Sequence, residues 1–186
     1  MMFSGFSPVR GPRRLWSVVA LCGALAACAL TLTTAASAAR GGDRARAAAT
    51  PSCATSGLVI WMDTQGNGTA GTIFYTLEFT NLSGRTCTLR GYPGVSAINL
   101  SGGRVGSAAS RLTGHAVKTV TLGKGATATA TLGAVDTGAL PNCRMTTAAG
   151  LRVYPPNQTA SRTIPFPFPA CANSGPAFLR VAPVAK

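Results

Sequence analysis

Acidic side chains and histidine are scarce in this sequence, which leaves few residues for catalysis or metal binding. Four of the 186 residues are Asp or Glu, and one is histidine. Any Ser-His-Asp triad must therefore use His115, and no G-x-S-x-G or S-x-x-K motif supplies a nucleophile for it. A glycosidase would need two of the three acids after residue 52, which are Asp63, Glu78 and Asp136. We therefore expect no catalytic residue, no cofactor and no metal site.

Basic residues are plentiful by comparison, because Lys and Arg number 17 against four acids and give a formal net charge of +13. Beyond the N-terminal segment they fall singly, neither clustered nor interleaved with stacking aromatics, so we do not expect nucleic-acid binding. Diffuse positive charge attracts anionic polymers and lipid head groups without specifying them. An anionic polymer of the cell envelope is therefore a candidate partner.

The N-terminal segment has the pattern of an export signal. Residues 1–14 carry arginines and no acid, residues 15–32 are uncharged and mostly apolar, and the small-residue site Ala36-Ser37-Ala38 follows. This order predicts a signal peptide over residues 1–38, cleaved after Ala38, and a location that is secreted or in the cell envelope. Two alternatives stay open. The apolar run is long enough for a retained anchor, and Leu25-Ala26-Ala27-Cys28 resembles a lipobox in which Cys28 is acylated.

Membrane contact is accordingly expected only through this leader or through a lipid on Cys28. Residues 39–52 are rich in Ala, Arg and Gly and predict a flexible tether, so a folded domain is expected over residues 53–186.

Six cysteines are present, and two of them lie in the leader. The four that remain are Cys53, Cys87, Cys143 and Cys171. An even number in an exported chain, without C-x-x-C spacing, predicts two disulfides. Three pairings are open, and we expect the sequential one, Cys53 with Cys87 and Cys143 with Cys171, because each bond then joins neighbouring strands.

Apolar and β-branched runs alternate with Gly, Pro and Asn at short intervals throughout the expected domain. The clearest strand is 73–80, where Ile73, Tyr75, Leu77 and Phe79 share one face. The segment Gly66–Gly71 matches G-x-G-x-x-G but precedes a strand instead of a helix, so we interpret it as a hairpin loop. No window predicts an amphipathic helix. About eight or nine strands predict an immunoglobulin-like antiparallel β-sandwich.

Prolines at alternate positions mark the run Ile164-Pro165-Phe166-Pro167-Phe168-Pro169. Because proline donates no ladder hydrogen bond, this run must be an edge strand or an extended loop. Phe166 and Phe168 either form an exposed ridge that contacts a partner or fold back onto the core beside Cys171. We favour the second, because aromatic side chains bury a large area.

Aromatic residues and arginines near these prolines are the candidate partner contacts, since both types are frequent at interfaces. The candidates are Arg90, Tyr92, Arg152, Tyr154, Arg162, Phe166 and Phe168.

Three stretches resemble one known family. The first is Thr80-Asn81 followed by the run from Thr86 to Val95, which reads Thr-Cys-Thr-Leu-Arg-Gly-Tyr-Pro-Gly-Val. The others are Gly103-Arg104-Val105-Gly106 and Leu151-Arg152-Val153-Tyr154-Pro155-Pro156. Together they are similar to the secreted actinobacterial family called domain of unknown function 4232, from about Cys53 to Val184. The resemblance implies an immunoglobulin-like sandwich in secreted proteins and lipoproteins. It implies no activity and no catalytic residue.

The sequence as a whole predicts an exported, monomeric, non-catalytic β-sandwich that serves as an envelope or extracellular binding or accessory module. The alternatives are a secreted hydrolase that uses His115, a purely structural accessory domain, and a lipoprotein tethered through Cys28.

Overall fold

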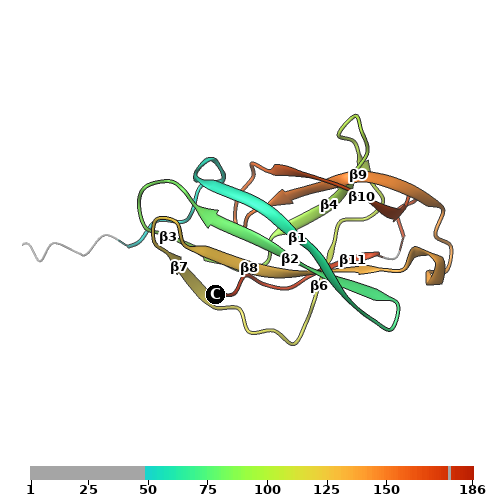
Figure 1. Cartoon of the computed structure of the whole chain (residues 1–186), viewed down its shortest axis with the longest axis horizontal. Helices are drawn as coiled ribbons and strands as arrows, with labels where there is room; N and C mark the ends of the chain where they lie inside the picture. Colours follow the sequence, from blue (N-terminus) through green and yellow to red (C-terminus); the bar gives the residue numbers. More distant parts are fainter. Residues whose placement is uncertain (1–48, 176) are drawn as a thin grey trace, which may run out of the picture. The chain divides into compact units, whose positions relative to one another are not determined.

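The structure is a computed structural model that describes residues 49–175 and 177–186 (Figure 1). The expected signal peptide, its cleavage site, Cys28 and most of the expected tether lie outside the described residues. Within them the chain forms eleven strands and two short 3-10 turns, η1 (Thr55–Gly57) and η2 (Thr137–Ala139), and no α-helix. The expected all-β class is confirmed.

The strands form three sheets. The first has the order β1-β2-β8-β11-β6, with β1 (Leu58–Thr69), β2 (Thr72–Asn81), β8 (Thr127–Val135), β11 (Leu179–Val181) and β6 (Ser110–Arg111). The second has the order β10-β9-β4-β5, with β10 (Arg162–Cys171), β9 (Met145–Tyr154), β4 (Gly94–Ile98) and β5 (Arg104–Val105). The third pairs β3 (Cys87–Arg90) with β7 (Thr119–Leu122). All pairs except β11–β6 are antiparallel.

The strand count exceeds the expected eight or nine because β5 and β6 have two residues each, too short to leave a periodic pattern. For residues 164–169 the sequence left an edge strand or an extended loop open. They belong to the ten-residue strand β10 (Arg162–Cys171).

One hydrophobic core lies between the first and second sheets, which form two layers in Figure 1. On β2 the alternation holds, with Leu77 and Phe79 fully buried while Thr76 and Glu78 are only partly buried. Leu151 of β9 faces them from the other layer. The strand period of two therefore places one row of side chains inside the sandwich, as expected.

Strand β10 lies at the edge of its sheet, where its prolines do not interrupt a ladder. Its three prolines are exposed, while Ile164 and Phe168 are buried. The register with β9 shifts between Pro165 and Phe168. Gly150 of β9 pairs with Pro165, where the shift begins. A Cβ at residue 150 would collide with the carbonyl oxygen of Ile164. The expected edge position is confirmed.

Both disulfides have the expected sequential pairing. Cys53 bonds to Cys87 at the start of β3, and Cys143 bonds to Cys171 at the end of β10. The last residues of the expected tether are attached to the same region, because the Pro51 carbonyl accepts hydrogen bonds from the amide (2.9 Å) and hydroxyl (3.3 Å) of Thr88.

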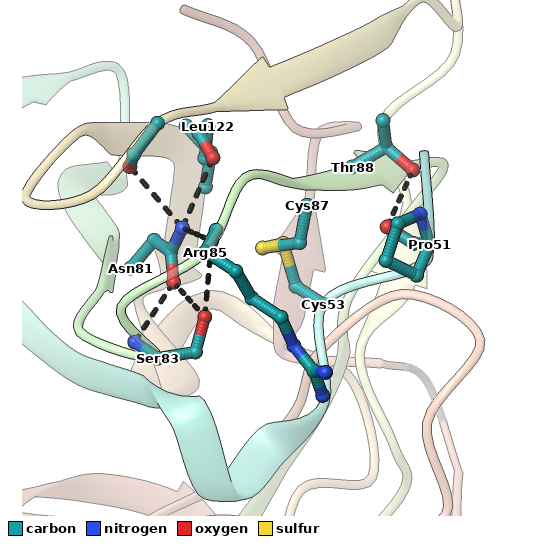
Figure 2. Close-up of a disulfide and its surroundings, with 9 residues drawn as sticks. Pro51, Cys53, Asn81, Ser83, Arg85, Cys87, Thr88 and Leu122 are labelled. Atoms are coloured by element: carbon teal, nitrogen blue, oxygen red, sulfur yellow. Dashed lines mark hydrogen bonds between the residues drawn. A yellow bond between two sulfur atoms is a disulfide. The ribbon is translucent and has the colours of Figure 1, made fainter. Parts of the chain in front are cut away.

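A buried asparagine braces the strand ends beside the first disulfide (Figure 2). Asn81 has no exposed surface, and its Nδ2 donates toward the carbonyls of Arg85 (2.8 Å), Leu122 (3.0 Å) and Gly123 (3.1 Å). Its Oδ1 accepts from the amide and the hydroxyl of Ser83. One side chain thus joins the β2–β3 loop to the β7–β8 turn.

Candidate functional site

The two phenylalanines among the candidate contacts lie in the core. Phe168 is buried, with 7% of its surface exposed, and Phe166 is partly buried against the core. The Phe166 ring centroid lies 5.1 Å from that of Tyr75 in an edge-on arrangement and 5.7 Å from that of Phe168. The interpretation that these rings fold back is therefore confirmed, and an exposed aromatic ridge is wrong.

The remaining candidates are spread over different segments. Arg152 and Tyr154 share the outer face of β9, where Arg152 Nη2 donates to the Gly102 carbonyl at 2.7 Å. Arg162 donates instead to the Thr55 carbonyl at 3.4 Å, on the strand face opposite to that of Arg152.

Tyr92 and Arg90 also lie apart from the residues of β9. The Tyr92 hydroxyl donates to the Leu112 carbonyl at 3.3 Å, and the Arg111 guanidinium lies 5.1 Å from the centroid of its ring. Arg90 is exposed at the end of β3. The arginines and tyrosines of the candidate set therefore do not form one binding patch.

His115 is exposed in the segment between β6 and β7. No hydrogen bond to its ring is present among the described residues, and residues 49–175 and 177–186 contain no group of three or more potential metal ligands. Nor does any helix within that part of the chain have the length and apolar character needed to cross a membrane.

A cleft of about 370 Å³ opens where the tip of the β1–β2 hairpin, the end of β8 and strand β10 meet. The hairpin wall comes from the segment expected to be a loop. Strand β1 in fact continues to Thr69, and Ala70 and Gly71 alone form the turn, with φ of 42° and 78°. Positive φ at both central positions matches the twist of the flanking strands and keeps a two-residue hairpin tight.

Backbone hydrogen bonds fix this wall in place. The Asp136 amide donates to the Gly71 carbonyl at 2.7 Å, which ties the hairpin tip to the chain just after β8. The Val135 amide donates to the Phe178 carbonyl at 2.8 Å. These hydrogen bonds join the hairpin wall of the cleft to the end of β8 and to the chain just before β11.

Apolar and aromatic side chains line most of the cleft. Ile73 and Tyr75 come from β2, and Phe168 and Pro169 come from β10. Ile73 is 45% exposed and does not belong to the core cluster, although it continues the inner-face row of β2. Such a large apolar side chain left open beside aromatic rings is typical of a binding cleft.

One charged side chain lines the cleft among residues 49–175 and 177–186. It is Asp136, whose Oδ1 accepts a hydrogen bond from the Gly138 amide at 2.9 Å. Asp136 thereby caps η2 and is held at the cleft.

Of the residues that line the cleft, the sequence indicated only Phe168 as a candidate contact. For Ile73 the sequence holds one hint, the uneven alternation at Ile73-Phe74-Tyr75. For Asp136 the hint is the rarity of acidic residues.

These features define the class of the protein: a β-sandwich domain with two sheets over one core, closed by two disulfides. Within that class, the chain belongs to the family described as a domain of unknown function (DUF4232), whose model matches residues 53–185. The family resemblance seen in the sequence is thereby confirmed. No curated protein and no solved structure matched the chain.

Proposed function

We propose that this protein is a non-catalytic binding module outside the cytoplasm, and that its ligand occupies the cleft beside the β1–β2 hairpin. The cleft itself supports this function. Its volume of about 370 Å³ lies within the range of small-molecule sites, and its apolar lining with one charged group is the composition such sites have.

The chemistry of the lining favours binding over catalysis. Among the described residues that line the cleft are one carboxylate, several threonine hydroxyls and Tyr75, with no histidine, lysine or cysteine. An activated nucleophile needs an adjacent base, and the described lining pairs none of its threonine hydroxyls with a histidine or lysine.

Export is the second part of the proposal. Two disulfides are compatible with an oxidising compartment, and the N-terminal pattern of arginines, an apolar run and Ala36-Ser37-Ala38 supports secretion. Intact mass spectrometry of the exported protein tests it. We expect a chain that begins at Ala39 and lacks four hydrogens. A diacylglycerol increment on Cys28 would replace free secretion with a lipid anchor, and a full-length mass would contradict cleavage.

Weak attraction to an anionic envelope polymer complements this proposal, with the protein as a monomer. The basic residues of the domain are exposed apart from the partly buried Arg152. Charge of this kind concentrates a protein near anionic surfaces and is screened by salt.

Binding in the cleft is tested with a neutral, environment-sensitive dye, N-phenyl-1-naphthylamine. We expect saturable binding by the wild type and its loss in Ile73→Arg, because the longer charged side chain fills and polarises the cleft. Val59→Arg is the matched control. Val59 is 46% exposed against 45% for Ile73 and lies on the same hairpin, but on the outer face and outside the cleft.

Equal thermal unfolding of the two variants shows that both remain folded. If Ile73→Arg binds the dye as well as Val59→Arg does, or if the wild type does not bind it, the cleft is not the binding site and the proposal is wrong.

A further inference from the structure

We propose that the cleft selects a small organic cation, in which an ammonium group is attached to an apolar body. The inference rests on the proposed function, because it names the class of ligand for the same cleft.

The charge of the cleft is opposite to that of the chain. The chain has a formal net charge of +13, yet none of the Lys or Arg residues in the described part of the chain is among those that line the cleft. Asp136 is there instead, one of three acids in the described part of the chain. Its Oδ1 is engaged by Gly138, and no hydrogen bond to Oδ2 is present among the described residues. That oxygen is the natural partner for a cationic group.

The aromatic residues add a second attraction for a cation. Tyr75 and Phe168 both line the cleft, and aromatic faces attract ammonium groups through the ring quadrupole. Ile73 and Pro169 offer apolar surface beside them, which suits the hydrocarbon part of the ligand. An anionic ligand would gain nothing from the rings and would meet Asp136.

The exposed basic residues elsewhere on the domain repel a cationic ligand at long range. At physiological ionic strength the screening length is about 8 Å, so exposed charges beyond that distance act weakly. A carboxylate in the lining contacts the ligand directly and is screened less. The local charge therefore decides which ligand binds, and the surface charge lowers only the rate of encounter.

The test is competition against N-phenyl-1-naphthylamine by three compounds of similar shape: benzyltrimethylammonium, its neutral carbon isostere neopentylbenzene, and phenylacetate. We expect benzyltrimethylammonium to bind about five- to tenfold more tightly than neopentylbenzene, and phenylacetate to bind more weakly than both.

Asp136→Asn removes the charge while its amide oxygen still accepts the Gly138 amide, so we expect the preference for the cation to fall below about twofold with the affinity for neopentylbenzene unchanged. Asp63→Asn is the matched control. Asp63 also accepts a backbone amide two residues on, from Gln65 at 2.9 Å, and it does not line the cleft.

Three outcomes overturn the inference. One is equal binding of cation and isostere by the wild type, and another is an equal effect of Asp63→Asn and Asp136→Asn, which would indicate net charge alone. The third is binding of benzyltrimethylammonium that persists in Ile73→Arg, measured directly by titration calorimetry because that variant is expected to lose the dye. Dye binding that is lost in Ile73→Arg while the cation shows no preference would leave the proposed function standing and reject only this ligand class.

Discussion

The Asn81 side chain forms more hydrogen bonds than any other side chain in the described part of the domain. It is the largest polar side chain among those with less than 2% exposure, and its amide lies within 2.8–3.1 Å of three carbonyl oxygens from two separate loops. Buried side-chain nitrogen and oxygen atoms without a partner are absent from the described residues. In the sequence Asn81 belonged only to the family resemblance, because local patterns do not show which carbonyls will surround a side chain.

Replacing the Asn81 amide by a carboxylate tests this role. In Asn81→Asp, the group that faces the three carbonyls becomes an acceptor, so these oxygens lose their donor and a charge is buried. We expect the free energy of unfolding to fall by about 3 kcal/mol or more, measured by urea denaturation with the disulfides intact.

Asn99→Asp is the matched control for that measurement. Asn99 is exposed and uses Oδ1 to accept the Gly103 amide at 2.7 Å, a role that a carboxylate keeps. We expect a change within about 0.5 kcal/mol. Similar losses in the two variants would show that the buried amide network is not what stabilises this corner.

Among the elements, β10 shows best what the sequence specifies and what it does not. Alternating prolines predicted an edge strand or an extended loop, because proline donates no ladder hydrogen bond. The large area of the aromatic rings predicted that Phe166 and Phe168 fold back onto the core. The extent of the strand was not predictable, because it depends on the register shift opposite Gly150, a contact between segments that are distant in the sequence.

The cleft was unpredictable for the same reason. Ile73 and Tyr75 occupy equivalent positions in the strand pattern, yet Tyr75 packs edge-on against Phe166 of the opposite sheet while Ile73 is 45% exposed. A pattern assigns a side chain to a face. It does not say where the facing sheet ends.

Substitution of Gly150 tests how far β10 depends on this close approach. A Cβ at residue 150 would collide with the Ile164 carbonyl oxygen and lie 3.3 Å from the Phe166 amide nitrogen, both backbone atoms that cannot rotate away. We expect Gly150→Ala to lower the free energy of unfolding by about 2 to 3 kcal/mol. Because β10 supplies a wall of the cleft, dye affinity should fall as well.

Gly68→Ala is the control on the opposite wall. Nothing lies within 4 Å of a Cβ at that position in β1, so the alanine should be neutral or stabilise by up to about 0.5–1 kcal/mol. If Gly150→Ala proves as stable as Gly68→Ala, the two strands do not approach as closely as the structure places them.

Across the whole domain, the two disulfides hold different regions. Cys53–Cys87 lies in the core beside the Asn81 network, and both cysteines are buried. Cys143–Cys171 ties the chain after η2 to the end of β10, two residues beyond the cleft residue Pro169. Cys143 is only partly buried. One bond therefore supports the core, and the other holds a wall of the cleft.

Removing each bond in turn separates these roles. The bonded cysteines are 34 and 28 residues apart, and loops of these lengths give nearly equal chain-entropy terms of about 3.5 to 4 kcal/mol. The Cys53→Ala/Cys87→Ala variant also loses two buried sulfur atoms, so we expect it to be the less stable by about 1 kcal/mol.

Dye affinity should show the opposite order, measured at low temperature and without urea so that both variants are mostly folded. Cys143→Ala/Cys171→Ala frees the end of β10, so we expect it to weaken dye binding severalfold, while the core variant keeps the wild-type affinity of its folded fraction. If Cys143–Cys171 holds the wall of the cleft locally, only the loss of that bond should weaken dye binding. An equal loss of affinity in both variants would mean that dye affinity follows global stability alone.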